Sequence, residues 1–337
     1  MLSDFALKAA LGLGPALLFI AGLVYIDSFK LVRFSTIAGV LLMGVLVALL
    51  AYFLSGQVMD WAHLGFLAYS RYYAPLVEEG LKALVVIWLF GRNRIGFMID
   101  AAILGLAVGA GFSIFENIYY AYLFPDANLG VWMVRGLGTA VMHAGTTAAF
   151  AISAQALRER HGVNGILAFI PGYLVAASLH SIFNQFTAWP IASTAVTVLA
   201  LPLVLLFLFD KSEHEMHNWL IHDYESHEHL LDDIRTGRFT HSEAGRFITA
   251  LSARFNDENS ALIFSYIKLH TELVLSAENL LLVREQGEKI STGEYDRERF
   301  AQLEALERQI GHTALLTVWP HFKFSRRELF ELHEFEK

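Results

Sequence analysis

The sequence contains no cysteine among its 337 residues, and only 17% of them are charged. The missing cysteines exclude disulfides, thiolate nucleophiles and thiolate metal ligands, so any chemistry must use histidine, carboxylate or hydroxyl side chains. A soluble domain carries about 25% charged residues, whereas 55% of this sequence is hydrophobic and its mean hydropathy is +0.45. The composition therefore indicates a membrane protein.

Two familiar kinds of motif are also missing from the sequence. There is no HExxH pair and no glycine-rich phosphate loop that follows a strand. The stretch GLAVGAGFSIF at 105–115 lies inside an apolar run, so we expect it to pack closely against another helix rather than to bind phosphate. The net charge of −8 excludes general nucleic-acid binding.

Long apolar stretches determine the predicted fold class. Seven of them approach or exceed the length of about 20 residues that a transmembrane helix needs. They are residues 9–26, 34–54, 72–90, 97–117, 131–157, 166–186 and 191–209. The first is long for a signal peptide and has no small-residue cleavage site, so we interpret it as a retained helix. The prediction is an all-α, polytopic membrane protein with about seven transmembrane helices.

Basic residues between these stretches predict the orientation in the cell membrane. Loops on one side carry Lys30, Arg33, Arg92, Arg94, Arg158, Arg160 and Lys211, and the opposite loops hold little beyond Lys8, Arg71 and Arg135. By the positive-inside rule, the more basic side is cytoplasmic. We therefore expect the N-terminus outside the cell and the C-terminus in the cytoplasm.

The sequence changes character after the transmembrane domain, which we assign to residues 1–210. Residues 211–240 are rich in histidine and acidic side chains, and we interpret them as a solvated juxtamembrane linker rather than a metal site. Residues 241–337 have amphipathic patterns over 242–255, 261–286 and 295–311. They predict a small cytoplasmic helical domain that can bind a cytoplasmic partner.

Charged residues inside a predicted span are the most informative feature of the sequence. The stretch 72–90 contains Glu78, Glu79 and Lys82, and each charge inside a transmembrane helix costs about 2.5–3.5 kcal/mol. On a helix, Lys82 lies one turn after both glutamates and can neutralise one of them. The other carboxylate then stays available for chemistry.

Three further predicted spans carry polar side chains. They are Glu116 with Asn117, His143 with Thr147, and His180 with Asn184. Counted at about 1.5 Å per residue from the outer ends of the spans, all of these groups fall in the outer half of the membrane, as does Glu79. Successive spans cross the membrane in opposite directions, so polar residues at unrelated positions would not be expected at one depth. Their common depth therefore predicts a single site.

Two chemistries are open to such a site. In one, a carboxylate acts as general base on water, an imidazole or amide stabilises the oxyanion, and a second acid protonates the leaving amine. In the other, a divalent metal such as zinc activates the water. The candidate metal ligands are Glu79, Glu116, His143 and His180, with Lys82, Asn117, Thr147 and Asn184 as supporting residues.

Ordered motifs in the region 70–190 resemble those of a known family. The segment EEGLK at 78–82 is similar to the EExxK motif, and FSIFENIYY at 112–120 to the FxxxEN motif, of PrsW-type intramembrane proteases. The two histidine helices resemble the remaining motifs, and HSIFN at 180–184 is also similar to the HxxxN motif of CAAX prenyl endopeptidases. That group and the APH-1 subunit of gamma-secretase are related to the family.

The resemblance implies a glutamic-type or metal-dependent intramembrane endopeptidase. Glu78 or Glu79 would activate water, Glu116 would support it, and His143 and His180 would complete the site. The implied substrates are single-span membrane-anchored proteins cut near the outer face, of which anti-sigma factors are the known example.

Two other functions compete with the protease hypothesis. An ion- or proton-coupled transporter also places acids and histidines inside the membrane, but the inner halves of these spans are almost wholly apolar. A non-catalytic scaffold such as APH-1 need not keep the EExxK pair, which this sequence retains.

Overall fold

The computed structural model describes most of the chain as helix. The described residues are 2–26, 32–160, 165–185, 189–252, 257–286, 294–311 and 314–315, and none of them forms a strand. The predicted all-α class is therefore confirmed for this part of the chain. The chain divides into two compact units, residues 1–213 and 214–337, whose mutual placement is not determined.

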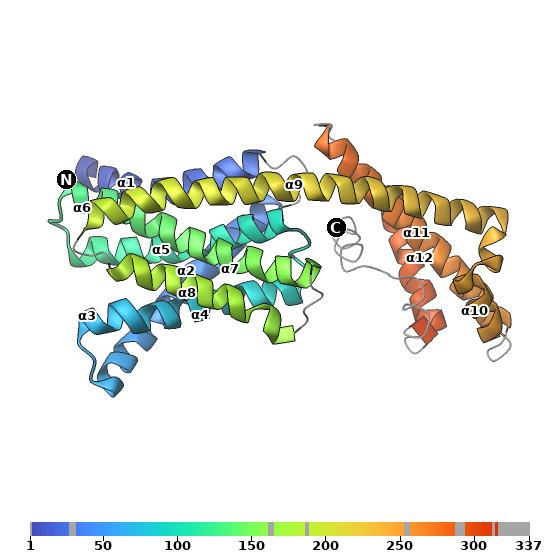
Figure 1. Cartoon of the computed structure of the whole chain (residues 1–337), viewed down its shortest axis with the longest axis horizontal. Helices are drawn as coiled ribbons and strands as arrows, with labels where there is room; N and C mark the ends of the chain where they lie inside the picture. The colour runs from blue at the N-terminus through green and yellow to red at the C-terminus, as the bar shows by residue number, and fades with distance from the viewer. Residues whose placement is uncertain are drawn as a thin grey trace. The chain divides into compact units, whose positions relative to one another are not determined.

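The first unit is a bundle of helices (Figure 1). In chain order it comprises α1 (Leu2–Ile26), α2 (Phe34–Ala62), α3 (Phe66–Ala68), the π-helix η1 (Tyr69–Tyr73), α4 (Ala74–Gly91), α5 (Met98–Leu123), α6 (Leu129–Met133), the π-helix η2 (Val134–Ala140), α7 (Val141–Arg160), the 3₁₀-helix η3 (Gly165–Ala168), α8 (Ile170–Gln185) and the part of α9 (Pro190–Thr236) up to residue 213. Where the structure describes them, the seven predicted apolar stretches lie on these helices.

Within the described part of the chain, four helical stretches are long and apolar enough to cross a bilayer. They are Phe34–Ala62, Met98–Leu123, Gly165–Gln185 and Pro190–Thr236, and a shorter apolar helix covers Leu7–Gly22. Helix α4 falls short of this standard because its 18 residues include Glu78, Glu79 and Lys82. A multi-pass membrane location is supported, while the number of seven spans and the orientation of the termini stay predictions.

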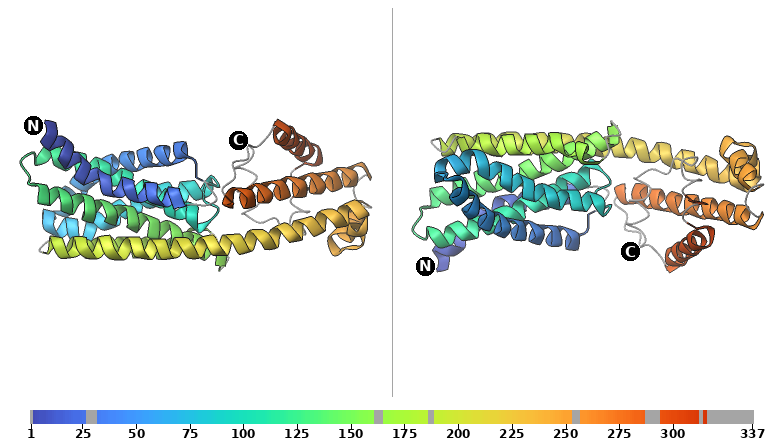
Figure 2. Two further views of the ribbon diagram at one scale, coloured as in Figure 1. Left: turned by 90° about the horizontal axis from the view of Figure 1, so that it is seen from above. Right: turned by 90° about the horizontal axis from the view of Figure 1, so that it is seen from below.

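Helix α5 lies at the centre of the bundle, as the two opposite views in Figure 2 show. Every residue of α5 from Met98 to Ser113 is buried, with α2 and α7 as its main neighbours. A Cβ atom added at Gly105 would lie 2.8 Å from the Ala148 Cα on α7, and one at Gly109 would overlap the His143 carbonyl oxygen. The prediction that this glycine-rich stretch serves close helix packing is confirmed.

The second unit is a smaller helical domain. It contains the end of α9, the 3₁₀-helix η5 (Arg238–His241), α10 (Glu243–Ser252), α11 (Asp257–Glu285) and α12 (Glu294–Ile310). Its core includes Phe239, Ile248, Ile263, Ile267, Val274 and Leu303, and Leu230 and Ile234 of α9 pack against it. Burial lowers the pKa of His270 to about 3, which keeps this imidazole neutral.

The three amphipathic helices predicted for this domain are present as α10, α11 and α12. The histidine-rich segment predicted as a linker is helical through Thr236, as the continuation of α9. The cytoplasmic location of the domain stays a prediction.

Candidate active site

Two of the helices that carry the polar residues of the site, α4 and α7, begin after a π-helical turn. η1 ends directly before α4, which bears Glu78 and Glu79, and η2 ends directly before α7, which bears His143. A π-turn inserts extra residues into the helical repeat and is frequent at functional sites. It rotates the side chains that follow relative to a regular helix, so the two turns help to set which faces of α4 and α7 point inward.

Lys82 and Glu79 form a buried ion pair at the centre of the site. The Lys82 Nζ lies 2.7 Å from the Glu79 Oε1, and their side chains are 0% and 2% exposed. The same ammonium donates to the His143 Nδ1 at 2.9 Å. The expectation that Lys82 neutralises one carboxylate of the pair is therefore confirmed, and Glu79 is that carboxylate.

Glu79 also holds the imidazole of His180. The Nδ1–H of His180 donates to the Glu79 Oε1 at 2.8 Å, and the Thr146 hydroxyl donates to the same oxygen at 3.3 Å. The Nε2 of His180 then lies 4.0 Å from the Glu78 Oε2. A carboxylate that accepts from one imidazole nitrogen fixes both the tautomer and the direction of the other nitrogen.

A second carboxylate holds His143 from its other side. The His143 Nε2 lies 3.0 Å from the Glu116 Oε2, and the Arg135 Nη2 lies 3.4 Å from that oxygen. The Arg135 Nε donates to the Asn117 Oδ1 at 2.8 Å, and the Asn117 Nδ2 donates to the Gly12 carbonyl at 2.6 Å. This chain of contacts ties α1, α5 and η2 to the imidazole.

Arg135 is a site residue that our sequence reasoning placed only among the loop charges. Its guanidinium also stacks over the Tyr120 ring at 3.7 Å. The position of Arg135 inside the predicted span 131–157 could have identified it, because an arginine at membrane depth needs a carboxylate partner. Glu116, with no lysine one turn away, was the acid without an assigned partner.

The predicted supporting residues have different surroundings. Thr147 donates to the His143 carbonyl of its own helix at 3.0 Å, and its neighbour Thr146 makes the contact with Glu79. Asn184 donates to the Ser70 carbonyl at 2.8 Å, which joins α8 to η1. The side-chain amide of Asn184 thus binds the backbone of η1 rather than a histidine or glutamate of the site, whereas Asn117 takes part in the contacts around Glu116.

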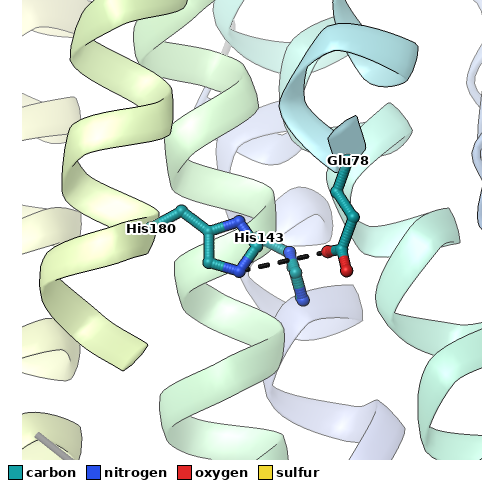
Figure 3. Close-up of side chains that lie close together, drawn as sticks. All are labelled: Glu78, His143 and His180. Carbon is teal, nitrogen blue, oxygen red and sulfur yellow. Dashed lines mark ion pairs between the residues drawn. The ribbon is translucent and has the colours of Figure 1, made fainter. Parts of the chain in front are cut away.

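Glu78, His143 and His180 form a potential metal-binding group (Figure 3). One donor atom from each of them lies within 4.8 Å of the others. The predicted ligand set contained Glu79 and Glu116 instead of Glu78. In the structure those two carboxylates each hold an imidazole. The side chain of Glu78, by contrast, makes no hydrogen bond among the described residues and is 17% exposed.

The donor set fits a divalent metal. Two imidazoles and a carboxylate, with one position left for water, are the ligands of catalytic zinc sites. Metal-bound histidines usually donate their second nitrogen to a carboxylate, as His180 does to Glu79. Both nitrogens of His143 already have a partner, so coordination by His143 would replace its contact with Lys82 or with Glu116.

The fold and the site together define a helical membrane protein with carboxylates and imidazoles gathered inside its bundle. Comparison with family models identifies the group. The model described as PrsW family intramembrane metalloprotease matches residues 29–209, and the chain belongs to this family. The resemblance seen in the motifs is confirmed, and the family supports peptide-bond hydrolysis at the membrane. Searches of curated proteins and of solved structures found no match.

Proposed function

We propose that the chain is an intramembrane endopeptidase that cuts single-span, membrane-anchored proteins near the outer face of the membrane. The observation that carries this proposal is the convergence of Glu78, His143 and His180, from α4, α7 and α8, to within 4.8 Å inside the bundle. Family membership supports the reaction, and the loop charges support the orientation that puts the site near the outer face.

Glu78, His143 and His180 would hold the catalytic metal. A divalent ion held there would supply a water of lowered pKa and would polarise the scissile carbonyl. Glu79 and Glu116 orient the two imidazoles, and Arg135 holds Glu116 in place. Rigid support of this kind matters because a ligand misplaced by about 1 Å can cost about 100-fold in rate.

The more exposed side of the site suits an extended substrate segment. Glu78 and Glu116 are 17% and 25% exposed, whereas the Glu79 and His180 side chains are 2% and 3% exposed. Among these four side chains, those of Glu78 and Glu116 are therefore the more accessible ones. A single-span substrate whose helix ends near the outer face would present an unwound, cleavable peptide there.

The test of this function is cleavage and metal content in the full-length protein. We expect fragments of single-span proteins, detected by mass spectrometry in membranes of a host that makes the wild-type chain, to be absent with His180→Ala. Purified His180→Ala should contain one zinc ion fewer per chain than wild type. Chelation should stop cleavage, and added zinc should restore it. His222→Ala, at an exposed histidine of the second unit, is the control.

The alternatives give distinct outcomes. Full activity in chelator would reject the metal while leaving the same residues to a metal-free mechanism, in which Glu78 is the general base. Wild-type fragments from His180→Ala would remove the site altogether.

A glycine far from the reacting atoms should also affect the rate. In Gly109→Ala the new Cβ would overlap the His143 carbonyl oxygen and lie 2.6 Å from the Ala144 Cα. Helix α7 must move and take His143 with it, so we expect cleavage to fall by about 100-fold, measured as kcat/KM on an identified substrate. Gly39→Ala, where no atom lies within 4 Å of the added Cβ, should behave as wild type. Equal activity of the two variants would contradict this prediction.

A further inference from the structure

A second group of metal-ligand side chains lies in the unit formed by residues 214–337. Asp223 and His227 of α9 and Glu278 of α11 each offer one donor atom, and these atoms lie within 4.8 Å of one another. The group is separate from the candidate active site, because none of its residues belongs to the first unit.

The group is built on two antiparallel helices. His217 lies 2.8 Å from Glu285, His227 lies 2.9 Å from Glu278, and Arg235 lies 3.6 Å from Glu272. Residue numbers rise along α9 as they fall along α11, so these ion pairs fix the register of the two helices. Asp223 precedes His227 by four residues and therefore lies on the same face of α9.

Burial distinguishes this group from a surface ion pair. The Glu278 side chain is 0% exposed and that of His227 is 16% exposed. By contrast, the side chains of His217 and Glu285 are 43% and 25% exposed. Among the described residues, that pair has no third donor close enough to form a metal group.

Two carboxylates that converge on one imidazole point to a cation. Oxygens of Asp223 and Glu278 lie within 4.8 Å of each other, and like charges at that distance repel when both are ionised. A divalent ion between them removes the repulsion and compensates the buried carboxylate.

The donor types and spacing select the class of metal. An imidazole with two carboxylates suits zinc and similar transition ions, whereas magnesium and calcium prefer oxygen ligands alone. Donor atoms around a tetrahedral zinc ion, with bonds of about 2.0–2.2 Å, lie about 3.3–3.5 Å apart. That spacing lies between two values seen here. The His227 Nδ1 and the Glu278 Oε1 are 2.9 Å apart, and no two donor atoms of the group are more than 4.8 Å apart.

We propose that Asp223, His227 and Glu278 bind a zinc-class divalent ion that clamps α9 to α11. Helix α9 contains an apolar stretch long enough to cross the membrane and continues to Thr236. An ion at this position therefore joins α11 to the part of α9 that belongs to the second unit.

The experiment counts zinc in the purified full-length protein after metal removal and equilibration with zinc sulfate. We expect Asp223→Asn to hold one zinc ion fewer per chain than wild type, with affinity for that ion weakened at least about tenfold. His227→Ala should do the same, and His227→Cys should restore binding through its thiolate. Zinc should slow hydrogen exchange of the α11 amides around Glu278 in wild type but not in Asp223→Asn.

The control is His217→Ala, which removes the other histidine paired with a glutamate of α11. It should bind as much zinc as wild type. Equal zinc in wild type and Asp223→Asn would overturn the proposal. An equal loss from His217→Ala would overturn it as well, because zinc would then be held by the histidine-rich surface in general. Circular dichroism of each metal-free variant checks that it is folded.

Discussion

Replacement of Glu78 by glutamine is expected to abolish cleavage and to leave the protein folded. The side chain of Glu78 makes no hydrogen bond among the described residues and is 17% exposed. Within that part of the chain, its carboxylate has one ion-pair contact, at 4.0 Å to the His180 Nε2. The glutamine side chain has nearly the same shape but neither the charge to hold a metal nor the basicity to accept a proton from water. Loss of a general base alone lowers a rate by about 10²–10⁴-fold.

The matched variant is Glu79→Gln. The Glu79 carboxylate is 2% exposed and accepts from Lys82, His180 and Thr146. Its loss should therefore lower both cleavage and the thermal stability of the protein, whereas Glu78→Gln should lower cleavage only. The measurements are kcat/KM on one identified substrate and the thermal unfolding midpoint in detergent. A destabilised Glu78→Gln beside a stable Glu79→Gln would show that the two roles are reversed.

Much of the site could be predicted from the sequence because its polar residues stand in apolar surroundings. A charge or imidazole within a membrane span needs a partner, and the ordering of the spans placed all of these groups at one level. The pairing of Lys82 with Glu79 is local, since they are three positions apart on one helix. Local spacing of this kind does not depend on how the helices pack.

The division of roles between neighbouring residues could not be predicted. Glu78 and Glu79, like Thr146 and Thr147, are adjacent in sequence and project about 100° apart on a helix. Which of the two faces the site depends on the rotation of α4 and α7. That rotation is set by the preceding π-turns and by the packing of Gly109 on α7, and neither is visible in the hydrophobic pattern.

In the second unit, too, the sequence could not predict which residues come together, here between helices that are far apart in the chain. The amphipathic pattern predicted its three helices, but it could not show that α9 continues into this unit and pairs with α11. Asp223 and His227 are one turn apart in the sequence, whereas Glu278 comes more than fifty residues later. Its approach is determined by the core around Ile267 and Val274, so the group was not foreseen.

Removal of the Lys82 charge is expected to cause the largest loss of stability. In Lys82→Met the apolar length of the side chain is retained, but Glu79 stays ionised and buried without its ammonium partner. Breaking a buried ion pair in this way costs about 3–5 kcal/mol, and the Lys82 and Glu79 side chains are 0% and 2% exposed. The free energy of unfolding of the variant in detergent should fall by that amount.

The double variant Lys82→Met, Glu79→Gln distinguishes the contribution of the charge pair to stability from its contribution to cleavage. With both charges removed, neither is left buried alone, so we expect the double variant to be more stable than Lys82→Met and close to wild type. Cleavage should nevertheless stay lost, because His180 loses the ionised carboxylate that holds its Nδ1. A double variant as unstable as Lys82→Met would mean that Lys82 stabilises the bundle through its contacts with His143 and the Phe112 ring instead. A stable but inactive one would show that the pair is kept to orient the imidazole of His180.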